Sequence, residues 1–444
     1  MLQERFFAVL AWVQGSLLAR RLISGASWSL LGAVIGNGLG LAASILIARM
    51  LAREAFGYFI ALQTTVALVS AFAAFGVGIA ATRFTAELSR RDPARLQRIL
   101  ALCELIVLAA AIAGTVILLL GSQWLALHAF AAPPLASRIG LVALATMPLA
   151  LDGLQKSVLI GLSQLRGFAF ATIAGALTGL PLMLGLTYAC GLDGAVLGLL
   201  CNALAASAAS RLQMRSALSG LAIRPTLAGS RAEFDTLARI ALPGVLSGLL
   251  PVVSLWLVQA ILIRSASPGE LAIFGVAMQW FGIVNFVPTS LARALMPLLT
   301  DVVADQNHRR SGSVLLAGIA ANSLTALPVA VVGALLSSWI VDSYGPQFAG
   351  GELPLMIAMG VAVVYAAQYP VQQLLAARAQ MWRALLLSGA NAGVFVGGAA
   401  LLVGRGATGA ALAFAAAYLV QAAIAAVYAS RFLLLGRARR ALRS

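Results

Sequence analysis

Apolar segments of about 20 residues alternate with short polar segments along almost the whole chain. A helix of about 20 apolar residues is long enough to cross the hydrocarbon core of a bilayer. We therefore predict an all-α polytopic membrane protein with twelve transmembrane helices. The predicted spans lie near residues 25–47, 58–80, 99–121, 139–161, 168–190, 194–212, 240–263, 272–298, 313–336, 353–375, 384–404 and 407–430.

The segment before the first span is apolar but short. It holds an apolar run of about thirteen residues between charged positions, which is too short for a span, and no small-residue cleavage site follows it. We predict an interfacial helix on the cytoplasmic face, in which Arg20 and Arg21 directly precede the first span.

An internal repeat divides the chain near its longest polar stretch, 213–239. The repeated segments share almost the same offset, which is close to half of the chain. The matches are Ile45-Leu46-Ile47 with Ile261-Leu262-Ile263, Glu54 to Gln63 with Glu270 to Gln279, and Gln155 and Arg166 with Gln372 and Arg383. Agreement on one offset predicts two halves that share a fold.

The repeat predicts five parts of the chain. They are an interfacial segment at 1–23, an N-terminal lobe at 24–212, a cytoplasmic linker at 213–239, a C-terminal lobe at 240–430 and a basic cytoplasmic tail at 431–444. Because each lobe has six spans, both lobes enter the membrane from the same side. The two lobes are then related by a parallel pseudo-two-fold axis along the membrane normal, around a central cavity that opens to either side.

Charge fixes the expected orientation of these spans. Hydrophobic residues make up 61% of the chain and charged residues only 10%, against roughly 25% charged residues in soluble domains. Of the 30 lysines and arginines, 25 lie in the tails and even-numbered loops or beside them, and 5 lie in the odd-numbered loops. Positive charge stays on the cytoplasmic side, so both termini are predicted to be cytoplasmic. A polytopic chain without a large soluble domain is typical of a transporter.

Several other functions are excluded by what the sequence lacks. The net charge of +16 lies in the cytoplasmic loops and tails, where it meets anionic lipid, and no folded basic module predicts a nucleic-acid partner. The cysteines lie in apolar segments at 103, 190 and 201, and the histidines lie in loops on opposite sides at 128 and 308. We therefore predict no metal and no cofactor. No P-loop and no acid pair in a soluble domain are present, so we predict that the protein is not an enzyme.

Charge inside a predicted span gives the sharpest candidate for a binding residue. Asp152 and Lys156 lie one turn apart in the fourth span, with Gln155 between them. A charged side chain at mid-bilayer costs about 2.5–3.5 kcal/mol or more. One interpretation is a self-neutralising pair, because Asp before Lys at i,i+4 is the favourable order. The other is a cavity wall that contacts an anionic substrate. The matching segment of the second half, with Gln372, is polar without charge.

Other polar residues in or beside the spans are weaker candidates. Arg83 and Arg293 lie at the cytoplasmic ends of the second and eighth spans, either as topogenic charges or as attractors of a phosphate at the cavity mouth. Glu104 is expected to pair with a nearby loop arginine. Amides scattered through the spans serve as interhelical hydrogen bonds or line a sugar-binding cavity: Asn37, Gln63, Gln259, Gln279, Asn285, Asn322, Asn391 and Gln421. A small residue at every fourth position from Gly32 to Ala48 predicts close packing of the first span.

Residues 24–95 carry a resemblance to a known family. The "ARxLxxxxFGxF" pattern at 48–59 is followed by Gly76, Gly78 and Arg83. Together with the twelve-span layout, these residues resemble the polysaccharide transporter family, the Wzx-type lipid-linked oligosaccharide flippases, within the MATE-like multidrug/oligosaccharidyl-lipid/polysaccharide exporter superfamily. The resemblance covers the layout of the whole chain and the motifs of about seventy residues.

The resemblance implies a MATE-like fold and a function at the bacterial inner membrane. It implies that undecaprenyl-pyrophosphate-linked oligosaccharide moves from the cytoplasmic to the periplasmic leaflet by alternating access, for surface or exopolysaccharide assembly. Implied partners are that lipid-linked substrate, membrane lipids, a polysaccharide polymerase and glycosyltransferases. The expected substrate-binding residues are Lys156, Asp152, Arg83, Arg293, Asn37, Gln63, Gln155, Gln279 and Gln372. Wzx-type cavities commonly contain several basic residues, whereas here Lys156 is the chief cation within the spans.

Two other functions compete with the flippase. One is a MATE-like cation-coupled exporter of amphiphilic drugs, which would depend on Glu104 or Asp152. The other is a non-transporting scaffold for glycosyltransferases, which predicts that replacing Lys156 and Arg83 changes nothing.

Overall fold

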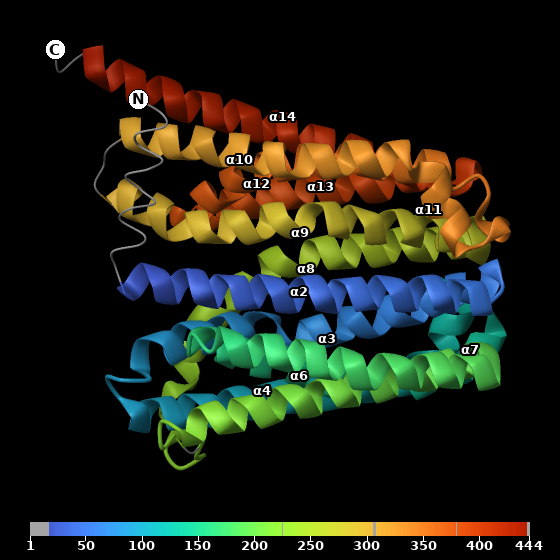
Figure 1. Cartoon of the computed structure of the whole chain (residues 1–444), viewed down its shortest axis with the longest axis horizontal. Helices are drawn as coiled ribbons and strands as arrows, with labels where there is room; N and C mark the ends of the chain where they lie inside the picture. Colours follow the sequence, from blue (N-terminus) through green and yellow to red (C-terminus); the bar gives the residue numbers. More distant parts are fainter. Residues whose placement is uncertain (1–16, 224, 305–307, 379, 442–444) are drawn as a thin grey trace.

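Helices make up nearly all of the described backbone in the computed structural model, which covers residues 17–223, 225–304, 308–378 and 380–441. No strand occurs in these ranges. The predicted interfacial helix before residue 17 and the last three residues of the predicted tail lie outside them. The helices run side by side along the long axis, and the first and last described residues lie at the same end (Figure 1). We call this end the terminal end and the other, which holds α11, the opposite end.

The first half of the chain contributes a bundle on one side of the molecule. Its α-helices are α2 (Leu17–Met50), α3 (Arg53–Leu88), α4 (Pro93–Trp124), α5 (Ala136–Ala143), α6 (Thr146–Gly161) and α7 (Leu165–Ser219). A π-helical turn at Leu125–Ala129 and a 3-10 turn at Pro133–Leu135 connect α4 to α5. Within this half, α3 packs against α4 and α6, and α2 packs against α7.

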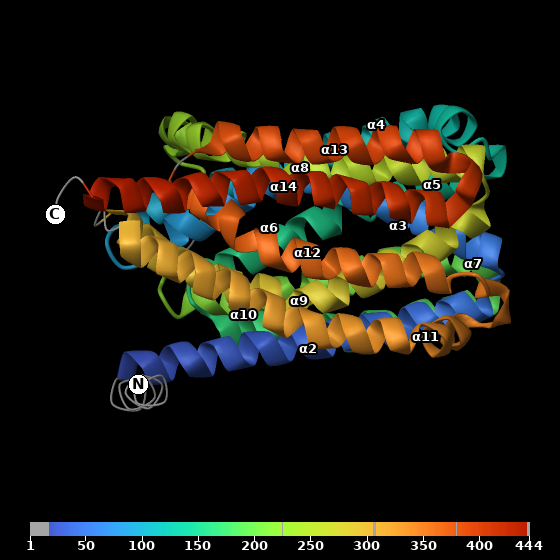
Figure 2. The same ribbon diagram turned by 90° about the horizontal axis from the view of Figure 1, so that it is seen from above.

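The second half forms the bundle beside it. Its α-helices are α8 (Phe234–Ser265), α9 (Pro268–Ala304), α10 (His308–Leu335), α11 (Ser337–Tyr344), α12 (Glu352–Ala377), α13 (Met381–Leu402) and α14 (Gly406–Ala441). Short 3-10 turns at Ser230–Glu233, Pro346–Phe348 and Val403–Arg405 lie before α8, α12 and α14. Figure 2 shows α13 and α14 running side by side with α12 next to α14, and these helices contact one another. The two halves meet mainly where α3 packs against α8 and α9.

All twelve predicted spans coincide with helices, although fewer than twelve separate helices qualify as spans. Over the described residues, eight helices are long and apolar enough to cross a membrane, and α5 with α6, bent by 42°, makes up to nine. Two predicted spans share α7, two share the stretch Trp382–Phe432, and α2 contributes the shorter apolar segment Val34–Met50. The count of twelve is consistent with this structure and stays a prediction. The predicted linker is partly helical, because α7 continues to Ser219 and α8 begins at Phe234.

Two matching glycine turns show the internal repeat in the backbone itself. Gly191 has φ 58° and ψ −131°, and Gly406, which follows at nearly the offset of the sequence repeat, has φ 56° and ψ −136°. Residues other than glycine rarely adopt a positive φ of this kind. Three positions after each turn, Gly194 and Gly409 approach the carbonyl oxygens of Leu186 and Leu402, and an added Cβ would lie 1.8 and 2.0 Å from them. Both halves therefore enter their last predicted span through the same backbone turn, which lies inside α7 in the first half and before α14 in the second.

The small-residue face of α2 permits the close packing that its sequence predicted. A Cβ added to Gly32 would lie 2.6 Å from the Cβ of Ala169, and one added to Gly36 would lie 2.7 Å from a methyl of Thr172. Both partners belong to α7. The glycines of α2 therefore allow it to pack closely against α7, a helix that lies more than 100 residues later in the sequence.

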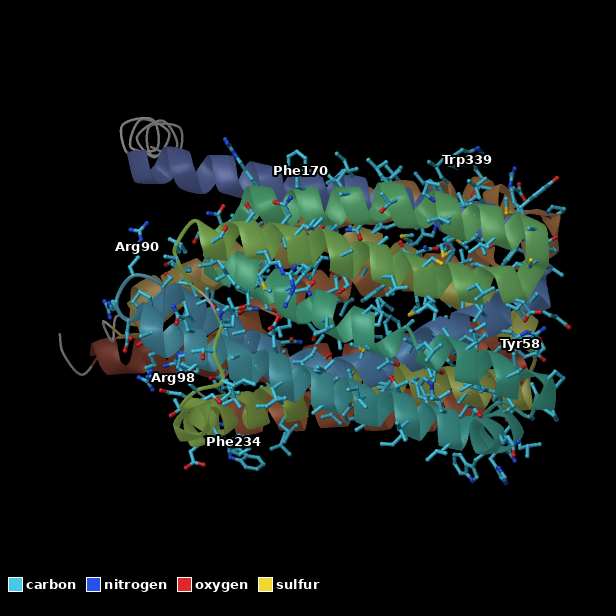
Figure 3. All side chains as sticks on the ribbon, turned by 90° about the horizontal axis from the view of Figure 1, so that it is seen from below. Tyr58, Arg90, Arg98, Phe170, Phe234 and Trp339 are labelled. Carbon is cyan, nitrogen blue, oxygen red and sulfur yellow. The ribbon has the colours of Figure 1, made fainter. Side chains whose placement is uncertain are left out.

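The buried apolar residues form one core at the opposite end and two separate cores toward the terminal end. The largest cluster joins Phe56 and Ile139 of the first half to Phe274 and Tyr344 of the second. Toward the terminal end, one cluster around Leu96 and Leu154 belongs to the first bundle and also contains Leu237 of α8. Another cluster around Leu315 and Leu374 belongs to the second half. Figure 3 shows Arg90 and Arg98 at the terminal end and Tyr58 and Trp339 at the opposite end. Among described side chains, the two halves thus share their largest core at the opposite end, and at the terminal end Leu237 of α8 reaches the core of the first bundle.

Candidate functional site

The predicted charged pair in α6 is present and is held by a third residue. The Lys156 Nζ atom donates to Asp152 Oδ2 at 2.7 Å, and Ser210 of α7 donates its hydroxyl to Asp152 Oδ1 at 2.6 Å. Asp152 is buried at 9% exposure, while the Lys156 side chain is 25% exposed. The carboxylate is therefore satisfied on both oxygens, and a quarter of the Lys156 side chain stays exposed.

Gln155, the neighbour of Lys156, has different surroundings. It is 2% exposed, and its Oε1 atom has no hydrogen-bond partner among the described residues. It lines a cavity between α4, α6 and α7. Gln155 thus belongs to the interior of the first bundle.

The other predicted residues are scattered. Arg83 and Gln63 are exposed on α3, Asn37 is exposed on α2, and Gln372 is half-buried on α12. None of these four forms a side-chain hydrogen bond or ion pair with another described residue. The Arg293 side chain lies outside the described residues. The structure therefore brings together Asp152 and Lys156, and it leaves the assignment of the remaining residues to one site as a proposal.

Gln279 takes part in hydrogen bonds between the halves. Its Oε1 atom accepts from Ser44 of α2 at 3.1 Å and from the Tyr344 hydroxyl of α11 at 2.9 Å. A second bond runs from Thr64 of α3 to Gln259 of α8 at 2.6 Å. Gln279 follows Thr64 along the chain by the same offset at which Gln259 follows Ser44. That offset of 215 is one residue short of the 216 that aligns Gln63 with Gln279 in the sequence, so the repeat relates the two bonds only approximately.

Arginines at the opposite end add charged contacts between the halves. Arg53 of α3 pairs with Glu270 of α9 at 2.6 Å and donates to the Gly269 carbonyl oxygen at 3.1 Å. Glu270 also accepts from the Ala407 backbone N–H at 2.7 Å, which attaches the start of α14. Arg49 of α2 donates to the Ser343 carbonyl oxygen at 2.6 Å.

These contacts involve the few arginines that depart from the charge asymmetry of the sequence. Of the five arginines in odd-numbered loops, Arg49, Arg53 and Arg264 bond across the halves, the last to the His128 carbonyl oxygen. Arg138 pairs instead with Asp193 within the first half at 2.6 Å. Sequence reasoning missed this group, although the signal was present: an arginine where the topology rule predicts few requires a local partner.

The second half carries an uncharged polar group where the first half carries charge. The Gln421 Oε1 atom of α14 accepts from Gln368 of α12 and from Asn391 of α13, each at 3.2 Å. All three amides are buried. They perform the interhelical role predicted for such amides, and the two halves are chemically unequal, as the sequence indicated.

Comparison with known proteins agrees with this architecture. A family model described as polysaccharide biosynthesis protein matches residues 22–303. The EPS I polysaccharide export inner membrane protein EpsE of Ralstonia nicotianae is 26% identical over 417 residues, which cover 89% of this chain and 91% of that protein. An inward-facing MATE family transporter of the MOP superfamily superimposes with a TM-score of 0.77 at 16% identity, covering 93% of this chain and 98% of that one. An outward-facing MATE structure gives 0.68 at 17% identity, covering 96% of each chain.

These findings confirm the resemblance seen in the sequence. The relatives and structural neighbours are exporters and transporters, not enzymes. The family model covers well over half of the chain, and the structural likeness covers nearly all of it. The chain therefore belongs to the polysaccharide biosynthesis protein family, with the all-helical MATE-like fold of the MOP superfamily.

Proposed function

We propose that this protein is a flippase of the bacterial inner membrane for undecaprenyl-pyrophosphate-linked oligosaccharide. It moves the repeat unit from the cytoplasmic to the periplasmic leaflet by alternating access, for surface or exopolysaccharide assembly. Family membership and the export role named for the EpsE relative support the substrate class. Both termini are cytoplasmic in this proposal, so the terminal end faces the cytoplasm.

The observation that carries the mechanism is the unequal joining of the two halves. Their described apolar side chains share one core at the opposite end and form two cores toward the terminal end. The polar contacts that Ser44 and Arg53 make with the second half also lie toward the opposite end. At the terminal end, Arg95 and Arg98 of α4 pair with Glu233 of the turn before α8. This arrangement supports a carrier that is closed to the periplasm and open to the cytoplasm. The better superposition on the inward-facing MATE structure agrees with it.

Chemistry gives each part of the substrate a place in this mechanism. A glycan and a pyrophosphate cannot cross hydrocarbon, so they need a polar path between the lobes, while the polyprenyl tail stays in the bilayer. Lys156, whose side chain is partly exposed, is our candidate for contacting the pyrophosphate, and Arg83 and Arg293 are candidates for attracting it at the mouth. Asp152 positions Lys156. Amides such as Asn37, Gln63, Gln155, Gln279 and Gln372, which donate and accept hydrogen bonds, are candidates for the sugar hydroxyls.

The first test is the leaflet distribution of lipid-linked oligosaccharide in a strain that lacks this protein. We expect the intermediate to accumulate on the cytoplasmic leaflet and the wild-type gene to clear it. If the intermediate does not accumulate and fluorescent dyes are retained instead, the cation-coupled drug exporter replaces this proposal.

A cross-linked variant separates a carrier from a scaffold. Arg53→Cys/Glu270→Cys, with Cys190 and Cys201 replaced by serine, places one thiol on each half at the opposite end. Joining the two thiols with a bismaleimide should stop clearance, because the halves can no longer part there. The same variant without the linker is the control. A linked protein that still supports clearance would favour the non-transporting scaffold.

A further inference from the structure

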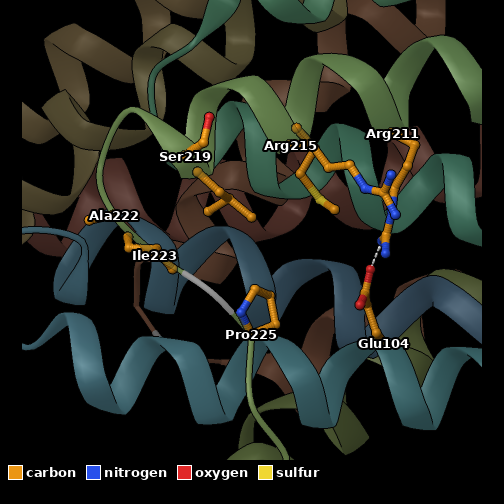
Figure 4. A pocket seen from close by; sticks show the side chains of 9 residues that line it. Glu104, Arg211, Arg215, Ser219, Ala222, Ile223 and Pro225 are labelled. Carbon is orange, nitrogen blue, oxygen red and sulfur yellow. Dashed lines mark hydrogen bonds and ion pairs between the residues drawn. The ribbon is translucent and has the colours of Figure 1, made fainter.

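A cavity lies inside the first bundle, away from the contacts between the halves. It occupies about 760 Å³ between α4, α6 and the second part of α7, and an adjoining cavity of about 630 Å³ extends it toward the terminal end. Glu104, Arg211 and Pro225 line both. Figure 4 shows Pro225, Ala222 and Ile223 of the segment after α7 covering one side of the adjoining cavity.

This cavity carries an excess of positive charge. Arg211 of α7 pairs with Glu104 of α4. The sequence predicted a loop arginine as the partner of Glu104, whereas the actual partner lies within a helix. Figure 4 shows the guanidinium of Arg215 beside that of Arg211, and Arg215 has no ion pair to any described residue. One carboxylate cannot neutralise two guanidinium groups, so an anion would be stabilised here.

A buried amide lies at the same level as these charges. The hydrogen bond from Ser210 to Asp152 fixes the register of α7 against α6. Gln155 lies three positions beyond Asp152 toward the terminal end, which places it level with the turn that begins at Arg211. Its Oε1 atom has no partner in the described protein although the residue is 2% exposed. A buried oxygen of this kind requires a donor from whatever fills the cavity.

The deeper wall of the cavity is apolar and open on one side. Leu105, Leu144, Met147 and Leu204 line it and are 47%, 46%, 39% and 52% exposed. Leu204 precedes Arg215 by about three turns of helix, or roughly 16 Å along the axis. The charged side chains of the cavity thus lie toward the terminal end, and its apolar surface lies toward mid-membrane. A phospholipid in the leaflet on that side has the same arrangement, with its charged headgroup outside its acyl chains.

We propose that this cavity binds an anionic phospholipid with a hydroxylated headgroup, phosphatidylglycerol. Its phosphate pairs with Arg215 and Arg211, a glycerol hydroxyl donates to Gln155 Oε1, and an acyl chain lies along the apolar wall. Basic pockets between transmembrane helices bind such headgroups. A zwitterionic headgroup would bring an ammonium beside two arginines. The smaller cavity of the second half, about 220 Å³, has one arginine, Arg383, whose guanidinium lies over the Tyr428 ring.

Native mass spectrometry of the detergent-purified full chain tests this proposal. The protein is exchanged into equal amounts of phosphatidylglycerol and phosphatidylethanolamine, and the retained lipid is identified by mass. We expect one retained phosphatidylglycerol in wild type and about five- to tenfold less retention in Arg215→Gln. Arg90→Gln is the matched control, since it removes the same charge from an exposed position at the same end. Ala208→Trp, which fills the wall and keeps every charge, should also displace the lipid.

Each other outcome overturns the proposal. Equal losses in Arg215→Gln and Arg90→Gln would mean that surface charge alone attracts lipid. Equal retention of the two lipids would mean that the cavity selects only an apolar chain. A retained polyprenyl phosphate would assign the cavity to the export substrate, and a wild-type protein that retains no lipid would leave the cavity without this ligand.

Discussion

Asp152 and Lys156 form a pair whose members have unequal surroundings. The Asp152 carboxylate accepts from two donors and has little exposed surface. The Lys156 ammonium has one acceptor among the described residues, and a quarter of the Lys156 side chain is exposed. A lysine ammonium carries three N–H groups, so Lys156 keeps donors that an anionic substrate can use. In the proposed mechanism, Asp152 holds the pair in place and Lys156 contacts the substrate.

A single and a double substitution separate stability from export. Lys156→Met should lower the free energy of unfolding by about 1–3 kcal/mol, because the desolvated carboxylate of Asp152 loses its counter-charge. Asp152→Asn/Lys156→Met should recover most of that loss, since an amide still accepts from Ser210. We expect both variants to leave lipid-linked oligosaccharide on the cytoplasmic leaflet. Thermal unfolding in detergent and the leaflet assay measure the two effects, and full export by the double variant would make the pair purely structural.

The sequence predicted a contact within one helix, but it did not identify the partners of the contacts between helices. Asp152 and Lys156 were predictable because a separation of one helical turn places them on one face. The bond from Ser210 to Asp152 and the pair of Arg211 with Glu104 join residues 58 and 107 positions apart. Helix register decides such contacts, and a pattern of apolar residues does not contain it.

At the scale of elements, the two glycine turns offer a matched comparison. Gly191 and Gly406 have nearly the same φ and ψ but different neighbours. An added Cβ at Gly191 meets no described atom within 4 Å, whereas one at Gly406 would lie 2.2 Å from Glu270 Oε2. The first site isolates backbone strain, and the second adds a collision with a residue that joins the halves.

Alanine substitutions at these turns should therefore differ in cost. Gly191→Ala should destabilise the protein by about 1–3 kcal/mol through strain. Gly406→Ala should cost more, because Glu270 must also move away from Arg53 and Ala407. Gly220→Ala is the control, since that residue has φ −61° and ordinary contacts. Thermal unfolding in detergent gives the order, and equal losses at Gly191 and Gly220 would contradict the strain argument.

The spans could be located from the sequence because the thickness of the bilayer sets a minimum length for each one. The bends and turns that interrupt helices could not be located in this way. The bend between α5 and α6 falls within the predicted span 139–161, at a point where the sequence stays apolar. The glycine turns were missed for another reason: the spacing Gly-x-x-Gly at 191 and at 406 repeats across the halves but is short and common.

For the whole molecule, the ion pair between Arg53 and Glu270 should favour the state that is closed at the opposite end. Glu270→Ala removes that pair and the bond to Ala407. We expect it to populate a longer distance between spin labels at Ala52 and Ala266, which are exposed on the two halves, in a background without Cys190 and Cys201. Pulsed electron resonance in nanodiscs measures both populations.

A neighbouring ion pair supplies the control for this measurement. Arg138→Gln breaks the bond to Asp193 at the same end but within the first half. Its distance distribution should match that of the wild type. A shift as large as that of Glu270→Ala would mean that any lost charge at this end opens the molecule, and that contacts between the halves have no special role.

The pairing of the two halves was predictable only in outline. A repeat at close to half the chain length indicated two related bundles, and the bonds of Ser44 with Gln279 and Thr64 with Gln259 follow that relation to within one residue. Which end is joined was not predictable, because it depends on the relative free energies of the contacts at the two ends, which a pattern of apolar residues does not contain.

The close packing of α2 against α7 also has a consequence for biosynthesis. Gly32 and Gly36 need Ala169 and Thr172, which are translated only after the predicted second, third and fourth spans. At roughly 5–20 residues per second, the ribosome requires on the order of ten seconds to supply them. During that interval the glycine face of α2 has only lipid or the insertion machinery as a neighbour. The first helix must therefore remain in the bilayer without its packing partner until the fifth predicted span is inserted and packs against it.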